Sequence, residues 1–407
     1  MNYLTLSLRN VLRNPRRSLA TALAVAFGYA AVNLFSGYIH NVYQGLGMQA
    51  VHGERLGHLT ITRPDALQRG SLEPAQYLFA GDELQRLLSH LRADPEMERV
   101  ALRLGLSGLI SNGLVSTVFI GEGMAPADVA ALAASVGPAG GGLLHPQRPL
   151  AAVATDLAAM LELGIDSYAV LVGATVHGQT NAVDTEVGAL FNTGNAGTND
   201  KFVLLPLELA QRLLDTDGAD RLVLLLRDPA RLDAVRARLG TELAAAGFAV
   251  DIHSWQELSS FYRQVRGLFD MIFVFIFAIV LVIVLLSIIN TMSMAVLERT
   301  REIGTLRALG MRRRTVAGLF TLEGVLLVSL GGIGGLLLTL AARAGVNAMN
   351  WSYVPPNSSG AVPLWVDLVP AVLLLSFSLL ALAAALAALL PARRAARMPV
   401  VDALGHV

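Results

Sequence analysis

The sequence predicts a membrane protein with four transmembrane α-helices and a large α+β extracytoplasmic domain inserted between helices 1 and 2. Hydrophobic residues make up 54% of the 407-residue chain and charged residues only 15%. This composition is too apolar for an ordinary soluble protein. The apolar residues also gather into four stretches, and each of them has the roughly 20 residues needed to cross a hydrocarbon core of about 30 Å.

The four apolar stretches occupy residues 18–39, 267–290, 316–342 and 366–390. The first follows several arginines, as the core of a signal peptide would. Its apolar run is longer than the roughly 7 to 15 residues of a signal-peptide core, so we expect a retained membrane anchor.

The arginines predict the orientation of the chain. They gather before the first span, between the second and third spans and after the fourth, whereas the connection between spans three and four has one at its edge. By the positive-inside rule both termini and the 291–315 connection are cytoplasmic, and the insert lies outside. The arginines concerned are Arg9, Arg13, Arg16, Arg17, Arg299, Arg301, Arg307, Arg312, Arg313, Arg314, Arg393, Arg394 and Arg397.

The insert, residues 41–265, is long enough to form a hydrophobic core of its own. It alternates β-like runs such as "YAVLVGATV" with amphipathic helical patterns such as "GDELQRLLSHLRA", which indicates an α+β domain of one or two subdomains. The predicted domains are therefore residues 1–40 with the first span, 41–265 with the outer domain and its stalk, and 266–407 with the other three spans and a short C-terminal tail.

Just before the second span, five apolar residues recur at spacings of 3, 4, 3 and 4, the pattern of an amphipathic helix. With no Gly-Pro break before the span, a helix running from 255 to 297 would extend about 65 Å. Such a helix would be a stalk that carries displacement across the membrane. The alternative is a short helix that stops at the membrane and only seats the domain. The stripe consists of Trp255, Leu258, Tyr262, Val265 and Phe269.

A charged segment, "VLERTREIGTLRALGMRRRTV" at 296–316, separates spans two and three. Helical spacing places Ile303 and Leu306 on one face, and Gly310 is a stop signal. Acidic and basic residues alternate at i,i+3 spacing, which supports a helix. Glutamates gain nothing beside anionic lipid headgroups, so a helix that docks on a protein partner explains the segment better than an interfacial one. For Arg312 to Arg314, a role as topology markers is sufficient.

Three features within the spans have simple packing explanations. Gly331 and Gly335 have GxxxG spacing, which allows close helix approach, and we favour packing within the four-helix bundle over dimerisation. Glu323 lies inside span three, where a carboxylate is costly, and we expect it to pair with an arginine or to reach the membrane surface. Asp270 is expected to pair with Arg266 one turn earlier.

The sequence contains no recognisable catalytic or metal-binding pattern. Its one lysine, Lys201, lacks the glycine frame of a nucleotide-binding P-loop, and cysteine is absent. The eight histidines form no HExxH motif, and no GxSxG motif is present. A formal net charge of zero gives no reason to expect nucleic acid as a partner. We therefore predict that the chain is not an enzyme and holds no cofactor or metal.

The segment "LERTREIGTLRALGMRRRTV" resembles the signature of the FtsX/MacB-like ABC permease superfamily. The likeness continues in "LEGVLLVSLGGIGGLLL" and "LLPARRAARMPVVDAL", and "DKFVLLPLELAQRLL" is similar to the periplasmic core domain of that family. In the family, the segment between spans two and three rests on an ATPase pair. The resemblance thus implies a coupling helix at 298–310 whose ATPase-contacting residues are Glu298, Arg299, Glu302, Ile303, Leu306, Arg307 and Gly310.

The same resemblance implies the setting of the protein. We expect an ATPase on separate chains, with ATP and Mg bound there, as in the lipoprotein-releasing relatives. A second permease chain, identical or different, would complete the complex in the bacterial inner membrane, among membrane lipids and with the large domain in the periplasm. The implied activity is mechanotransmission, in which ATP-driven movements reshape the outer domain.

The substrate implied by the resemblance is a lipoprotein, passed to a lipoprotein carrier, or another hydrophobic molecule at the outer face of the membrane. Three alternatives remain open at this point. One is drug or peptide export with a periplasmic adaptor. Another is signalling to a periplasmic enzyme such as a cell-wall hydrolase. The third is a membrane sensor or scaffold without an ATPase.

Overall fold

The computed structural model describes residues 7, 9, 13, 15–133, 142–355 and 361–399. The chain divides into two compact units. A helical unit comprises Met1–Tyr43, Arg266–Ser352 and Pro363–Val407, and an α/β unit comprises Gln44–Val265 and Tyr353–Val362. The end of the predicted C-terminal tail, 400–407, lies outside the described residues.

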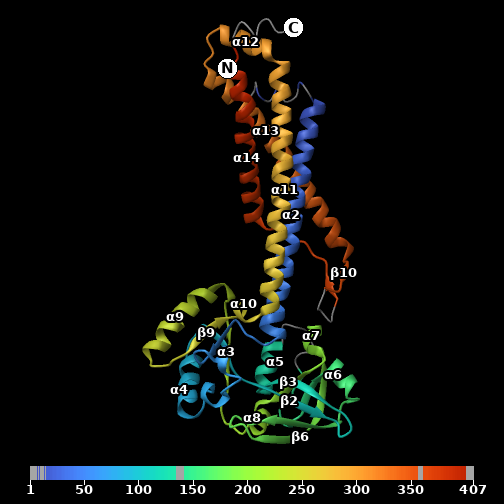
Figure 1. Ribbon diagram of the computed structural model, residues 1–407, viewed down its shortest axis with the longest axis vertical. Helices are drawn as coiled ribbons and strands as arrows, with labels where there is room; N and C mark the ends of the chain where they lie inside the picture. Colours follow the sequence, from blue (N-terminus) through green and yellow to red (C-terminus); the bar gives the residue numbers. More distant parts are fainter. Residues whose placement is uncertain are drawn as a thin grey trace. The chain divides into compact units, whose positions relative to one another are not determined.

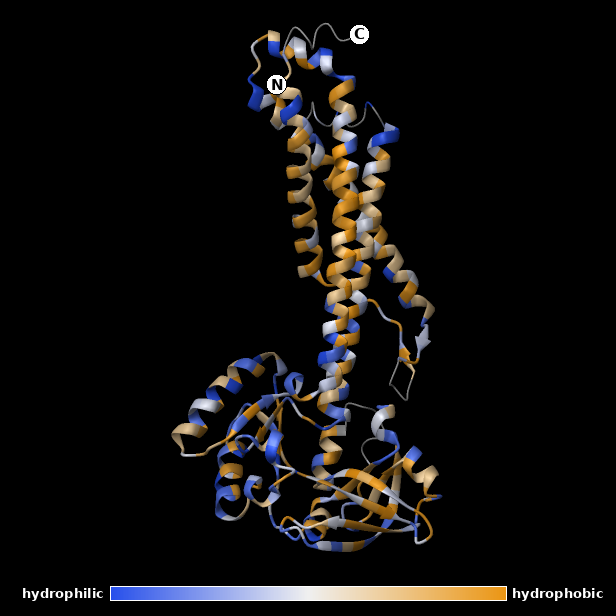
Figure 2. Ribbon diagram, in the orientation of Figure 1, coloured by the Kyte–Doolittle hydropathy of each residue, from blue (hydrophilic) through white to orange (hydrophobic). Residues whose placement is uncertain are grey.

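Four long helices form the helical unit: α2 (Pro15–Met48), α11 (Ser260–Glu298), α13 (Arg313–Met349) and α14 (Pro370–Arg397). Each is long and apolar enough to cross a membrane, which confirms the four predicted spans. They run side by side (Figure 1), with hydrophobic residues predominating along the middle of the bundle (Figure 2). The fourth helix begins later than predicted because Pro370, which has no backbone N–H to donate, occupies its first turn.

Small residues let the bundle helices approach one another closely. An ideal Cβ on Gly331 would lie 2.8 Å from the carbonyl oxygen of Ala22 in α2, and one on Gly335 would lie 2.7 Å from that of Ala26. The GxxxG pair therefore packs on the first span of the same chain, as predicted. Around this contact, all four helices contribute to one apolar core, which includes Val25, Val32, Val284, Ile288, Leu327, Val328, Leu380 and Ala384.

One subdomain of the α/β unit consists of two β-α-β segments, one from the beginning and one from the end of the unit. They are β1 (Leu59–Thr62), α4 (Gly81–Arg92) and β2 (Met97–Ser111), then β8 (Arg221–Leu226), α9 (Leu232–Ala245) and β9 (Asp251–Ser254). The strands lie in the order β2-β8-β1-β9 and every neighbouring pair is antiparallel. This is a ferredoxin-like arrangement. Both helices share one core with the sheet, so they cover the same face.

Strand β8 has an uninterrupted apolar sequence because both of its faces are buried. Leu222, Leu224 and Leu226 face the core shared with α4 and α9, whereas Val223 and Leu225 belong to a second core on the opposite face. A strand buried on both faces has no polar side to alternate with. The sequence "RLVLLL" therefore marks a central strand.

The other subdomain is a ring of strands that includes β2. Its other five strands lie between β2 and β8 in the sequence. Strand β2 pairs with β3 (Ser116–Met124), and the ring continues through β7 (Phe202–Pro206), β4 (Ala151–Ala154), β6 (Thr180–Phe191) and β5 (Tyr168–Ala174) back to β2. These pairings close a six-stranded barrel. The α+β class is therefore confirmed, and the domain has two subdomains joined by the long strand β2.

Shorter elements connect these strands. Those of helical type are a π-helical turn (Gln49–Gly53), α3 (Ala66–Arg69), a 3-10 turn (Pro74–Tyr77), α5 (Pro126–Ala133), α6 (Thr155–Met160), α7 (Ala196–Asn199), α8 (Leu207–Leu214), a 3-10 turn (Pro229–Arg231) and α10 (Trp255–Leu258). A separate two-stranded ribbon, β10 (Ser352–Tyr353) with β11 (Val362–Pro363), lies between α13 and α14 in the sequence.

The predicted unbroken helix from 255 to 297 is wrong at one residue. Helix α10 ends at Leu258, the next residue Ser259 has an extended backbone (φ −73°, ψ 100°), and α11 starts at Ser260. The Ser259 hydroxyl accepts a hydrogen bond from the Tyr262 backbone N–H at 3.3 Å, so Ser259 caps a new helix. Trp255 consequently lies on a separate short helix, and its ring packs edge-on against the Tyr262 ring at 4.7 Å.

The remaining stripe residues divide between the two helices. Leu258 ends α10, while Val265 and Phe269 lie on α11. The Phe269 ring contacts the rings of Phe35 and Tyr38 in α2. Helix α11 still has 39 residues and therefore extends about 58 Å, which exceeds the hydrocarbon thickness. The continuous part of the predicted stalk thus begins at Ser260.

Candidate coupling site

A short helix, α12 (Thr300–Ala308), connects α11 to α13 at the arginine-rich end of the bundle (Figure 1). It lies within the predicted coupling segment 298–310. Arg299, at its N-terminal boundary, has a non-helical backbone (φ −116°, ψ 19°), so the chain turns there. Helix α12 is therefore an element distinct from α11.

Gly310 ends α12 by backbone geometry. Its φ is +93°, a conformation that side chains with a Cβ rarely adopt. The Gly310 N–H donates to the Arg307 carbonyl at 3.0 Å, and the Met311 N–H donates to the Leu306 carbonyl at 3.1 Å. These are the two bonds of a Schellman motif. The predicted stop signal is confirmed, and it gives Gly310 a structural role.

Two exposed ion pairs connect the coupling segment to the N-terminal part of the chain. Arg13 donates to Glu302 at 2.7 Å, and Arg17 donates to Glu298 at 3.1 Å. Each such pair contributes at most about 1 kcal/mol. The first pair links α12 to the residues just before α2, and the second links the end of α11 to the first turn of α2.

A third ion pair, between Arg299 and Glu323 of α13, is buried. Their side chains approach to 3.4 Å and are 9% and 5% exposed. A buried charge without a partner is costly, and this pair gives each of the two buried groups an opposite charge. The prediction that Glu323 pairs with an arginine is confirmed. The pair also holds the turn between α11 and α12 against the third span.

Ile303 and Arg299, which were predicted to contact a partner, expose little surface to one. Ile303 is 5% exposed and packs in an apolar cluster with Val316, Phe320 and Ala392. Helical spacing alone located its apolar face correctly but could not show that α13 and α14 already cover that face. These two residues therefore seat α12 on the bundle and leave little surface for another chain.

The outward surface of α12 consists of other residues. Glu298, Glu302 and Gly310 are exposed, and Leu306 and Arg307 are half-buried. Arg307 donates to the backbone carbonyl of Met398 at 2.6 Å, beyond the end of α14. Sequence reasoning missed Leu309, which is 80% exposed. Its position directly before Gly310, the predicted stop residue, could have indicated this exposure, because a leucine at a helix end can lie outside the helix's own apolar face.

The predicted pair at the other end of α11 is also present. Arg266 lies 3.6 Å from Asp270, and the Tyr43 hydroxyl donates to Asp270 at 2.8 Å. All three residues belong to the helical unit, so this contact links α2 to α11. The pairing prediction for Asp270 is confirmed.

The four apolar helices, with a charged helix between the second and third of them, define an integral membrane protein. Two family models match the chain: the FtsX-like permease C-terminal domain over residues 274–400 and the MacB-like periplasmic core domain over residues 18–242. The second match covers more than half of the sequence. The chain therefore belongs to the FtsX/MacB-like permease family, and its α/β unit is a periplasmic core domain of that family.

Individual relatives are more distant. The chain is 30% identical over 152 residues to the macrolide export ATP-binding/permease protein MacB of Nitrobacter winogradskyi, covering 37% of this chain and 23% of that protein. It is 25% identical over 225 residues to an uncharacterised ABC transporter permease of Methanocaldococcus jannaschii, covering 54% of each. The chain thus spans between a quarter and about half of the length of these relatives.

Two solved structures are also similar. The extracellular domain of the noncanonic ABC-type transporter YknZ from Gram-positive bacteria matches with a TM-score of 0.34 and 10% identity, over 48% of this chain and 99% of that one. The periplasmic region of MacB from Actinobacillus actinomycetemcomitans matches with a TM-score of 0.34 and 9% identity, over 52% and 95%.

Proposed function

We propose that this protein is the membrane subunit of an ABC transporter and that a separate cytoplasmic ATPase drives it through α12. The observation that carries the proposal is the way α12 is held. Arg299, Ile303 and Arg307 fix it to the bundle, while Leu309 and Glu302 remain exposed. A helix that is rigidly seated and has a free apolar residue within a charged frame suits a docking surface.

The attachments of α12 support mechanotransmission. A push on α12 would pass to α13 through the buried Arg299–Glu323 pair and to the start of α2 through Arg13 and Glu302. Helix α11, 39 residues without a break, is stiff enough to carry displacement along its axis. Movements of the ATPase pair would in this way reach the outer domain, and ATP and Mg would be bound by the partner chains.

The setting follows from the arginine distribution. The end of the bundle that carries α12 would face the cytoplasm, and the periplasmic core domain would lie outside the inner membrane. A second permease chain would supply the other half of a symmetric docking surface for the ATPase pair.

A lipoprotein or another hydrophobic molecule held at the outer face of the membrane is the proposed substrate, with a lipoprotein carrier as acceptor. Export of a drug-like apolar molecule with a periplasmic adaptor is a second candidate, favoured because the MacB relative is a macrolide exporter. Lipoprotein extraction and drug export would use the same coupling mechanism. They differ in the substrate that the outer domain binds.

The test is affinity purification of the full-length protein from its native membranes, followed by mass spectrometry of the retained proteins. We expect an ABC-type ATPase to be retained by the wild type and lost from Leu309→Asp. The control is Leu72→Asp, because Leu72 is 79% exposed in the α/β unit and its substitution should leave ATPase recovery unchanged. Ile303→Asp is expected to lower the stability of the bundle itself, since it buries a charge.

The outcomes separate the alternatives. Lipoproteins retained with the ATPase support extraction, whereas a periplasmic adaptor supports export. Equal recovery of the ATPase from the wild type and Leu309→Asp would refute docking through α12. Absence of any ATPase, under conditions that preserve another ABC complex from the same membranes, would refute the transporter proposal.

A further inference from the structure

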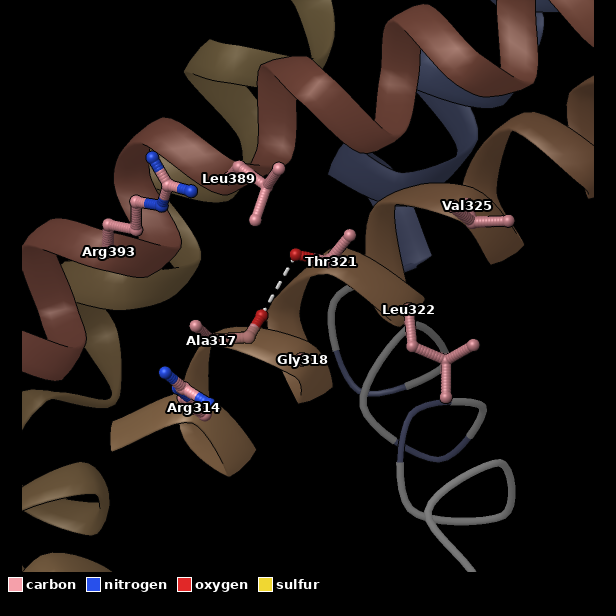
Figure 3. Close-up of a pocket in the computed structure, with 8 residues that line it drawn as sticks. All are labelled: Arg314, Ala317, Gly318, Thr321, Leu322, Val325, Leu389 and Arg393. Carbon is pink, nitrogen blue, oxygen red and sulfur yellow. Dashed lines mark hydrogen bonds between the residues drawn. The ribbon is translucent and has the colours of Figure 1, made fainter. Parts of the chain in front are cut away.

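The helical unit contains a hollow between α13 and α14, near the arginine-rich end of the bundle. It has a volume of about 480 Å³ and opens to the surface of the bundle. In Figure 3, Arg314, Ala317 and Thr321 of α13 lie on one side of this hollow and Leu389 and Arg393 of α14 on the other, with Leu322 and Val325 farther along α13. The lining residues are Arg314, Ala317, Gly318, Thr321, Leu322, Val325, Leu389 and Arg393.

The polarity of the hollow changes along its length. Arg314 of α13 and Arg393 of α14 lie at one end, and Leu322 and Val325 lie at the other (Figure 3). The Thr321 hydroxyl donates to the Ala317 carbonyl at 2.9 Å within α13, so this donor is satisfied without a ligand. The hollow is thus cationic at one end and apolar toward the middle of the membrane span.

The two arginines are exposed, and neither forms an ion pair with a carboxylate in the described part of the chain. This distinguishes them from Arg13, Arg17 and Arg299 at the same end of the bundle, each of which has a glutamate partner. Arg314 also lies in the first turn of α13, where the helix dipole favours an anion. Within the described residues, the positive charge that lines the hollow therefore has no carboxylate partner.

We propose that the hollow binds one anionic phospholipid. The guanidinium groups of Arg314 and Arg393 hold its phosphate, since arginine donates in a geometry that matches phosphate oxygens. An acyl chain then follows α13 past Leu322 and Val325. A phosphate ion would satisfy only the cationic end, whereas a lipid satisfies both ends and is already present at high concentration around a membrane span.

Gly318 forms the open floor of the hollow. An ideal Cβ on this residue has no atom within 4 Å, although glycine inside a helix costs up to about 1 kcal/mol relative to alanine. The position therefore admits a larger side chain without steric conflict. A leucine there would occupy the space that we assign to the lipid, and it should not disturb the fold.

The test is native mass spectrometry of the full-length protein in detergent, titrated with phosphatidylglycerol as the probe. We expect one tightly retained phosphatidylglycerol per chain. Arg314→Gln and Arg393→Gln should each weaken its retention about fivefold, which corresponds to one cationic contact per arginine. Gly318→Leu should also weaken it, through occupancy of the hollow and not through loss of charge.

Matched controls lie one residue away from each arginine. Arg313→Gln and Arg394→Gln remove equally exposed arginines of the same helices that do not line the hollow, and both should retain phosphatidylglycerol as the wild type does. Phosphatidylcholine, which has the same tails but no net charge, should not displace the probe, and neither should inorganic phosphate.

Two results would overturn the proposal. Equal loss from the control and hollow variants would show that the bound lipid responds only to the total charge at this end of the bundle. Displacement by inorganic phosphate would show a phosphate site that does not use the apolar end. The thermal unfolding midpoint of Gly318→Leu is measured in parallel, and a midpoint at or above that of the wild type shows that its loss of lipid is not caused by unfolding.

Discussion

At the scale of single residues, a buried cluster of charges fixes the segment that leads from α2 into the α/β unit. Glu122 of β3 is fully buried and accepts from Arg55, while Arg103 of β2 approaches it to 2.5 Å. Arg55 also has a left-handed backbone (φ +53°) and stacks over the Phe202 ring. One carboxylate thus serves two guanidinium groups, and it joins the chain entering the domain to both strands of the hairpin.

Replacing this carboxylate should be strongly destabilising. We expect Glu122→Gln to lower the stability of the α/β unit by about 3 to 5 kcal/mol, because two buried guanidinium groups lose their counter-charge. Glu186→Gln removes the partner of a pair with the largely exposed Arg148 and should cost less than about 1 kcal/mol. Amide hydrogen exchange of β3 in the full-length protein measures the difference, and equal protection in both variants would contradict this account.

His58 should make the same unit sensitive to acid. Burial, with a smaller contribution from the nearby His52, lowers the pKa of His58 from 6.5 to about 4. Its Nδ1 accepts a hydrogen bond from the Leu226 N–H at 3.0 Å, which requires the unprotonated form. Because the unfolded chain binds the proton more readily, stability is fully present above about pH 6.5 and is lost as the pH falls toward 4.

The loss should approach about 1.4 kcal/mol per pH unit between those two values. His58→Asn, which keeps an acceptor but cannot titrate there, should flatten the pH dependence of hydrogen exchange at β8. His177→Asn is the control, since His177 is exposed. If His58→Asn and the wild type respond to acid identically, another group causes the loss.

At the scale of the elements, the contact between α13 and α2 depends on glycine. Gly331→Ala would place a Cβ 2.6 Å from the side chain of Val25 and 2.8 Å from the Ala22 carbonyl. We expect a loss of about 1 to 3 kcal/mol from this overpacking. Gly334→Ala is the same substitution on the same helix, but its Cβ would meet only Ala26 at an ordinary 3.6 Å.

Thermal unfolding of both variants in one detergent checks this prediction. Gly334→Ala should match or slightly exceed the wild type, because alanine favours helix more than glycine does. Similar unfolding midpoints for the two variants would mean that the close approach of α13 and α2 is not needed for stability.

At the scale of the whole molecule, the absence of cysteine allows the orientation to be measured directly. Single Leu72→Cys and Leu309→Cys variants place one thiol at exposed positions of the α/β unit and of the coupling segment. With a membrane-impermeant thiol reagent, we expect Leu72→Cys to react in intact spheroplasts and Leu309→Cys only after permeabilisation. The reverse pattern would invert the topology that the arginines predict.

The sequence by itself determined the features that depend on neighbouring residues. Hydropathy located the four membrane helices, because a span must be apolar over its whole length. Gly310 marked the end of α12, because a left-handed backbone favours glycine. The pairs of Glu323 and Asp270 were foreseeable, because a charge at the edge of a span requires a partner.

Only the tertiary structure decided what depends on contacts between distant segments. Closure of the barrel needs pairings between strands far apart in the chain, which no local pattern records. The break at Ser259 required knowing that its hydroxyl caps α11 while the apolar spacing continues. Ile303 and Leu309 are both apolar and lie close together in the sequence. Packing against α13 and α14 buried Ile303 and left Leu309 exposed, and only the position of those helices could distinguish the two.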